Sequence, residues 1–172
     1  MKTLTFFLIT ICSTFAMQAQ NSRNDKLYRI QNANEDCAYV NSKGDTIVPF
    51  GKYLLCQDSI IKEIGFVYSN HGIFCINSQG IELFEVFNYD NGPDYPAQGL
   101  FRIIKDGKIG YANMHGKVVI EPKFKCAWPF EKGKAKVSYN CDINKKGEYN
   151  FWEGGDWFYI DRKGKKISKP IK

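Results

Sequence analysis

Four short turns of the same composition recur along this chain at a nearly constant spacing. Each begins with Asn or Asp and ends three residues later with Gly: NSKG at 41–44, NSQG at 77–80, NMHG at 113–116 and DRKG at 161–164. The first three glycines are 36 residues apart, and the fourth follows after 48. A fixed period of this length indicates a repeat array, in which each unit packs against its neighbours. The surplus length falls in a Gly- and Asn-rich insertion at 141–155.

The segments around these turns have the composition of β-strands. Tyr, Val, Ile and Phe are frequent, helical periodicity is absent, and AKVSY at 135–139 alternates strictly between small or apolar and polar residues. An Asx side chain bonds its own turn backbone and Gly accepts positive φ, so each turn suits a tight hairpin. The predicted fold is therefore all-β: antiparallel hairpins, each with one hydrophobic face, stacked over 37–172 as a solenoid-like array or a curved sheet.

One unit resembles a known family. Residues 108–137 read KIGYANMHGKVVIEPKFKCAWPFEKGKAKV and are similar to a unit of the WG-repeat (or KWG-repeat) proteins. Residues 155–170 match the first half of such a unit, residues 37–53 match it more weakly, and residues 73–90 keep the turn without its proline. The family's Trp-Gly pair is replaced by Ile109–Gly110. The resemblance implies an all-β repeat fold with a binding or scaffolding role and offers no catalytic residues. The matching residues of the best unit are Tyr111, Gly116, Val118, Ile120, Pro122, Phe124, Pro129, Phe130, Gly133, Ala135 and Val137.

The first nineteen residues, MKTLTFFLITICSTFAMQA, have the layout of a secretory signal peptide. One Lys precedes a long apolar run, and small and polar residues follow. A membrane anchor or a buried strand is the alternative, but the run is short for a span of about 20 residues. A lipoprotein is disfavoured because Ile11 precedes Cys12. We expect a signal peptide at 1–19, a polar lead-in at 20–36 and an exported, periplasmic or extracellular mature chain without a membrane span.

Export bears on the cysteines, because exported chains form disulfides. Five cysteines follow residue 19, so at least one thiol stays free or pairs between molecules. Cys126 and Cys141 flank the turn EKGK almost symmetrically and could face each other across a hairpin. A Cys126–Cys141 disulfide and free buried thiols remain open alternatives.

The formal net charge of +6 falls to +5 when residues 1–19, with Lys2, are removed. The lysines are spread over turns and strand edges, where they commonly protect sheets against aggregation. This distribution does not favour nucleic acid as a partner.

Two Gly-rich stretches carry the candidate ligand contacts. The first, FNYDNGPDYPAQG at 87–99, places Tyr89 and Tyr95 beside Asp90 and Asp94. The second, NFWEGGDWFY at 150–159, contains two tryptophans. Exposed aromatics beside carboxylates hold sugars or peptides by stacking and hydrogen bonding, although such rings also pack between repeats. The ligand-contact candidates are Tyr89, Asp90, Asp94, Tyr95, Trp152 and Trp157.

Catalytic and metal sites are not predicted. His71 and Cys75 are four residues apart, which along a strand separates them by about 13 Å, too far for a nucleophile and its base. Residues 142–153 match part of a calcium loop, but Lys146 occupies a position that needs an oxygen ligand. We expect a polar loop there, no catalytic residue, no metal and no cofactor.

The sequence therefore predicts an exported, non-enzymatic β-repeat protein of a bacterial envelope, whose partner is an unidentified protein or glycan. A carbohydrate- or wall-binding module that uses the aromatic loops is the alternative. Clustered exposed Trp and Tyr would favour sugar, whereas a flat aliphatic patch would favour a protein partner.

Overall fold

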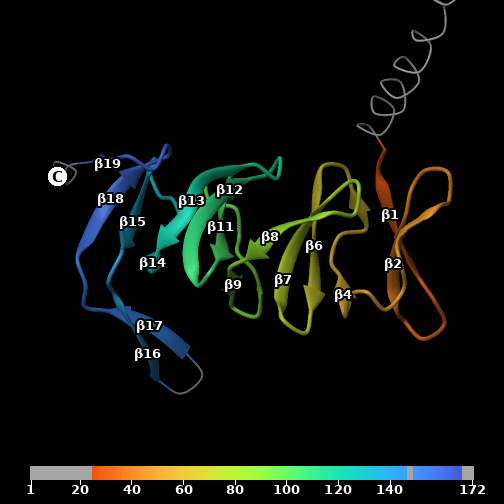
Figure 1. Cartoon of the computed structure of the whole chain (residues 1–172), viewed down its shortest axis with the longest axis horizontal. Coiled ribbons are helices and arrows are strands. Elements are labelled where there is room, and N and C mark those ends of the chain that lie inside the picture. Colours follow the sequence, from red (N-terminus) through yellow and green to blue (C-terminus); the bar gives the residue numbers. More distant parts are fainter. Residues whose placement is uncertain (1–24, 147–148, 168–172) are drawn as a thin grey trace, which may run out of the picture.

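The computed structural model describes residues 25–146 and 149–167, which form a row of short antiparallel sheets (Figure 1). Four units follow one another along the row, each a meander of three strands. The predicted signal peptide at 1–19 lies outside the described residues. The strands of unit 1 are β1 (Leu27–Gln31), β2 (Cys37–Val40) and β3 (Thr46–Val48), and those of unit 2 are β6 (Ile64–Ser69), β7 (Gly72–Asn77) and β8 (Glu82–Val86).

The other two units repeat the pattern. Short strands connect the units, and one extra hairpin is inserted in unit 4. The strands of unit 3 are β11 (Leu100–Lys105), β12 (Lys108–Asn113) and β13 (Val118–Phe124), and those of unit 4 are β15 (Lys134–Ser138), β18 (Trp157–Asp161) and β19 (Lys166–Ile167). The connecting strands are β4 (Leu55–Cys56), β5 (Ile60–Ile61), β9 (Asn88–Tyr89), β10 (Gly92–Pro93) and β14 (Cys126–Ala127), and the inserted hairpin is β16 (Asp142–Lys146) with β17 (Tyr149–Glu153).

The four predicted turns join the second and third strand of each unit and share one hydrogen-bond pattern. In each turn the Asx Oδ1 atom accepts two backbone N–H groups at 2.9–3.0 Å, from the residues two and four positions later. The Gly N–H donates to the Asx carbonyl oxygen, and each Gly has positive φ. The prediction that these Asx side chains bond their own turn backbone is confirmed.

A fifth turn of this kind lies in the segment that was expected to be a polar lead-in. Asn32 Oδ1 accepts the N–H groups of Asn34 and Asp36 at 2.9 Å, and Glu35 takes the positive φ of 66° that Gly takes elsewhere. The turn joins β1 to β2, whose residues Arg29 and Tyr39 are paired. The expected lead-in at 20–36 is therefore corrected: its described part contains the first strand of unit 1.

The hydrophobic cores lie between the units, as the repeat pattern predicted. The first core joins units 1 and 2, the second joins units 2 and 3, and the third joins units 3 and 4. Strand β12 shows how one strand serves two cores: Ala112 belongs to the second core, whereas Ile109 and Tyr111 belong to the third. The expectation of a hairpin with one hydrophobic face is thus wrong for the inner units, whose sheets are buried on both faces.

Units 2 and 3 share one sheet, whereas the strands of units 1 and 4 lie in separate sheets. Strand β8 pairs with β11, so units 2 and 3 share one seven-stranded sheet, and none of the sheets closes into a barrel. The connecting segment always donates one backbone N–H to the first strand of the next unit: Gln57 to Phe66, Phe87 to Arg102 and Trp128 to Lys136, at 2.9–3.0 Å. The array is consequently open and held together strand by strand.

A register shift recurs with the same period. It falls between Tyr39 and Val40 in unit 1, between Cys75 and Ile76 in unit 2, and between Tyr111 and Ala112 in unit 3. Each of these is 36 residues from the next. Because a β-bulge strengthens local twist, the repeated shift gives successive units a common shape for stacking.

The turn glycines also stack on the preceding unit. A Cβ at Gly116 would lie 2.7 Å from side-chain atoms of Ile64 and Leu83 in unit 2, and a Cβ at Gly80 would lie 2.9 Å from Ile47 in unit 1. No atom lies within 4 Å of such a Cβ at Gly44, whose unit begins the described array.

This difference gives a matched pair of variants, Gly44→Ala and Gly116→Ala. Both place Ala at positive φ, which costs about 1–2 kcal/mol. Gly116→Ala additionally overlaps Ile64 and Leu83, and we expect a further loss of about 1–3 kcal/mol. Denaturant unfolding of the two variants measures the difference. Equal losses would contradict stacking of the turn on the preceding unit.

Two disulfides cross-link segments of the array. One joins Cys126 to Cys141, the pairing favoured by the sequence, and the other joins Cys37 to Cys56, which the sequence did not indicate. Cys75 is a free, buried thiol at the repeat position that Tyr39 and Tyr111 occupy in the neighbouring units. Burial raises the pKa of the Cys75 thiol to about 12, so it remains protonated and unreactive near neutral pH. Within the described ranges, no helix is long and apolar enough to cross a membrane.

Candidate functional site

The insertion that lengthens the fourth spacing forms the β16–β17 hairpin, which projects from the row below β15 and β18 (Figure 1). Its base is held by two reciprocal bonds: the Asp156 N–H donates to Asn140 Oδ1 at 2.7 Å, and Asn140 Nδ2 donates to Asp156 Oδ2 at 2.9 Å. The Cys126–Cys141 disulfide ties the same base to β14. The predicted polar loop at 141–155 is therefore largely an ordered hairpin, and its match to a calcium loop is not realised as one.

Trp152, on β17, anchors this hairpin to the array. Its ring centroid lies 5.3 Å from that of Trp128, 6.0 Å from that of Phe87 and 6.4 Å from that of Trp157. These four residues are called the aromatic cluster below. Trp152 and Trp157 are half-buried, whereas 48 % of Trp128 is exposed. The structure thus brings the second predicted contact loop, through Trp152, against Phe87, the first residue of the other predicted loop.

Two cations border the aromatic cluster. Arg102 Cζ lies 4.1 Å from the ring centroid of Phe87 and 5.5 Å from that of Tyr89, which is 51 % exposed. Lys136 Nζ lies 4.9 Å from the ring centroid of Trp157. Such cation–π contacts attract the cation to the face of the ring. The cluster is therefore both an anchor for the hairpin and a partly exposed aromatic surface.

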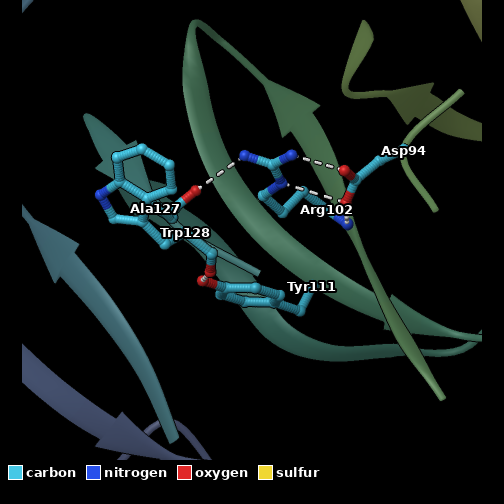
Figure 2. A network of polar contacts seen from close by, with 5 residues as sticks. All are labelled: Asp94, Arg102, Tyr111, Ala127 and Trp128. Atoms are coloured by element: carbon cyan, nitrogen blue, oxygen red, sulfur yellow. Dashed lines mark hydrogen bonds and ion pairs between the residues drawn. The ribbon is translucent and has the colours of Figure 1, made fainter. Parts of the chain in front are cut away.

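Asp94 does not belong to this surface. It is buried, and its carboxylate forms a two-armed ion pair with buried Arg102, whose Nε donates to Oδ2 at 3.0 Å (Figure 2). Asp94 Oδ2 also accepts the backbone N–H of Arg102 at 2.8 Å. The expectation that Asp94 contacts a ligand is corrected. Its carboxylate is buried, and its described hydrogen bonds all come from Arg102. An aspartate in a Gly/Pro loop is usually a surface residue, and no local pattern in the sequence indicates its pairing with Arg102.

Arg102 and Tyr111 tie the connecting strand β14 to unit 3. Arg102 Nη1 donates to the Ala127 carbonyl at 3.1 Å, and Tyr111 Oη donates to the Trp128 carbonyl at 2.7 Å (Figure 2). Unit 1 repeats the arrangement, since Arg29 donates to the Cys56 carbonyl and Tyr39 donates to the Asp58 carbonyl. In both units the Arg lies opposite the Tyr in the strand register. This recurring pair positions Trp128, and it is a functional support that sequence reasoning missed.

The buried tyrosines predict an alkaline loss of stability. Desolvation by burial is the main cause that raises the pKa of Tyr39, Tyr53 and Tyr111 in the folded chain. Because the folded state holds these protons more tightly than the unfolded state, stability is fully present below the unfolded pKa of about 10 and falls as pH rises above it. Urea melts from about pH 8 to about pH 11 should show this decline.

The matching control for that measurement is the tyrosinate absorbance of the same samples. The Cys75→Ala background removes the free thiol, so that disulfide exchange does not contribute at high pH. Three of the ten tyrosines should ionise only with unfolding. Ionisation of all ten at the ordinary pKa in a folded chain would contradict the burial argument.

The remaining predicted contacts of the first loop are exposed but separate from the cluster. Asp90 lies with Asn91 in the two-residue turn of the β9–β10 hairpin, and both take positive φ, as a type I′ turn requires. Tyr95 is 72 % exposed, and none of the ring contacts of the aromatic cluster includes it. Asp90 and Tyr95 thus remain predictions as ligand contacts, beside the better-placed Tyr89.

A shallow pocket of about 350 Å³ opens beside the foot of the inserted hairpin. It lies on the side of β18 that carries Phe158, whereas the neighbouring Trp157 belongs to the aromatic cluster. The sequence did not indicate this site, because its residues come from three separate segments. The lining residues are Tyr139, Asn140, Asp156, Phe158, Gly164 and Lys166.

His115 and the acidic side chains are the remaining groups to place in the described part of the chain. Residues 25–146 and 149–167 contain no group of three or more His, Cys, Asp or Glu side chains placed to hold a metal ion. His115, in the turn of unit 3, contacts Glu63, which lies just before the first strand of unit 2, and both side chains are exposed. This contact joins two units and has no nucleophile beside it in the described contacts.

The family comparison matches the unit at the centre of this site. The model of the WG containing repeat matches residues 109–140, which run from the second strand of unit 3 through Trp128 to two residues beyond β15. The chain contains a WG repeat. No curated protein and no solved structure matches it.

Unit 3 has no space for a side chain at Gly110. Gly110 occupies the Gly position of the family's Trp-Gly pair, and a Cβ there would lie 2.5 Å from the Ile120 carbonyl oxygen and the Pro122 nitrogen. These are backbone atoms, so no side-chain movement could relieve the overlap. The equivalent residues in units 1, 2 and 4 are Ala38, Phe74 and Phe158, so unit 3 alone of the four units has Gly at this position.

Proposed function

We propose that this WG-repeat protein is an exported, non-enzymatic binding protein of the cell envelope or its surroundings. The observation that carries the proposal is the inserted β16–β17 hairpin. In repeat arrays, insertions map to loops on one face, and that face commonly carries the binding surface. Here the insertion is fastened by a disulfide, by the Asn140–Asp156 bonds and by Trp152.

Export is supported by the predicted signal peptide at 1–19 and by the two disulfides, which persist in oxidising compartments. The partner docks on the aromatic cluster, with half-exposed Trp128 as its main contact and Tyr89 at its border. Tryptophan and tyrosine dominate protein-binding hot spots, because they bury large rigid surfaces and keep a polar group for hydrogen bonding. A protein partner is our first proposal.

A glycan partner is the second proposal, and one observation favours it. The exposed apolar surface around the hairpin is mainly aromatic: Trp128, Tyr139 and Phe151 are exposed there, together with the aliphatic Ile143. Aromatic rings bordered by polar groups suit sugar rings as well as peptides.

A pull-down from envelope extract tests the proposal. The bait is the disulfide-bonded chain from Gln20 onward, with untreated, protease-treated and glycosidase-treated extracts in parallel. Species lost only after protease indicate a protein partner, and species lost only after glycosidase indicate a glycan. The matched variants are Trp128→Ala in the cluster and Tyr28→Ala in unit 1, which also shortens an exposed aromatic. Capture that Trp128→Ala leaves undiminished would contradict docking on the cluster.

A further inference from the structure

The shallow pocket beside the hairpin has an aromatic floor. The ring centroid of Tyr139 lies 5.3 Å from those of Phe124 and Phe158, with tilts of 31° and 37° between the ring planes. Phe124 is fully buried in the third core, so the floor is fixed from below. Tyr139 is 53 % exposed and presents apolar ring surface to the pocket.

The rim of the pocket carries one acceptor and one donor. Asp156 uses its Oδ2 atom and its N–H to hold Asn140, and Oδ1 has no partner among the described contacts. Lys166 Nζ lies 4.9 Å from the ring centroid of Phe158, in cation–π contact, and has no described ion pair. A carboxylate oxygen and an ammonium group therefore flank the aromatic floor.

This combination selects a ligand by its chemistry. The opposite charges of Asp156 and Lys166 leave the pocket without a net electrostatic preference for an anion or a cation. A purely apolar ligand would take both charges out of water without giving them partners, which costs free energy. A neutral sugar suits the aromatic floor and both rim charges. Its C–H face covers an aromatic ring, and its hydroxyl groups donate to Asp156 and accept from Lys166.

We infer that this pocket holds one neutral pyranose residue of a glycan chain, stacked on Tyr139 and hydrogen-bonded to Asp156 and Lys166. The inference rests on the proposed binding function and adds a ligand class and a second site to it. The pocket volume of about 350 Å³ lies at the lower end of the range of small-molecule sites, which suits one ring and not a long chain segment.

The test uses cellotetraose and chitotetraose as probes, with ligand-observed NMR and calorimetric titration on the disulfide-bonded chain. We expect saturable binding of at least one probe. Tyr139→Ala should bind that probe about tenfold more weakly, because loss of an aromatic stack of about 1.4 kcal/mol corresponds to that factor. Lys166→Met keeps the side-chain stem but removes the donor, and Asp156→Asn keeps a partner for Asn140 but removes the charge. Both should weaken binding severalfold without lowering the melting temperature much.

Tyr28→Ala is the matched control, because it shortens another exposed tyrosine at the opposite end of the described array and should bind as the unaltered chain does. If neither probe binds at a concentration of about 10 mM, the inference is overturned. Equal affinity of Tyr139→Ala and the unaltered chain would place the sugar elsewhere and also overturn it. If either result occurs while a partner is still captured through Trp128, the proposed function stands and only the pocket assignment fails.

Discussion

Asp94→Ala should lower the free energy of unfolding by about 3–5 kcal/mol, because it leaves a buried guanidinium without its counter-ion. The side chains of Asp94 and Arg102 are 3 % and 2 % exposed, so water cannot replace the lost carboxylate. The same change also orphans the backbone N–H of Arg102, which donates to Asp94 Oδ2. Equilibrium unfolding in urea measures the loss.

Two further variants separate the ion pair from simple packing. In the double variant Asp94→Leu with Arg102→Met both charges are removed, and much of the stability should return, since a buried pair is often replaceable by apolar side chains of similar volume. Recovery should stay incomplete, because the Ala127 carbonyl loses the bond from Arg102 Nη1. Glu131→Ala, which removes an exposed partner of Lys132, should change stability little. A small effect of Asp94→Ala would show that water reaches the pair.

The repeat architecture was largely predictable because its signals are local. An Asx residue and a Gly three positions later define a turn by their own hydrogen bonds and by positive φ, so the four turns at 41–44, 77–80, 113–116 and 161–164 could be predicted without tertiary information. The fifth turn was missed because Glu35 takes the conformation that Gly marks elsewhere. With it, the first strand of unit 1 was missed, and the units were taken as hairpins and not as three-stranded meanders.

The candidate site was less predictable because it depends on which segments meet. Trp152 and the loop that begins at Phe87 were both chosen from composition, but their contact depends on how the β16–β17 hairpin folds back on the array. Asp94 was assigned to the surface because a Gly/Pro loop usually is exposed. Arg102 lies between the apolar residues Phe101 and Ile103, so the alternation of side chains along a strand predicts that it faces solvent. It is buried instead, because both faces of this strand are covered. Long-range pairing of this kind leaves no local pattern.

Removing the Cys126–Cys141 disulfide should cost about 3 kcal/mol by the loop-entropy estimate for a 15-residue separation, and it should also loosen the inserted hairpin. Alanine is the suitable replacement at both positions, because both cysteines are buried and a serine hydroxyl would need a partner. The three tryptophans of the chain are Trp128, Trp152 and Trp157, all members of the aromatic cluster. Intrinsic tryptophan fluorescence therefore reports on this part of the molecule alone.

The other disulfide supplies the control. Cys37→Ala with Cys56→Ala opens a similar separation of 19 residues and should lower stability by a similar amount, about 3 kcal/mol, but the hairpin remains tied. Native-state tryptophan emission should then shift to longer wavelength only in the Cys126→Ala, Cys141→Ala variant, because water reaches Trp152 when the hairpin detaches. If emission is unchanged there, the Asn140–Asp156 bonds and the ring contacts hold the hairpin without the disulfide. If both variants shift equally, the array loosens as a whole, and the disulfide is not specific to the binding surface.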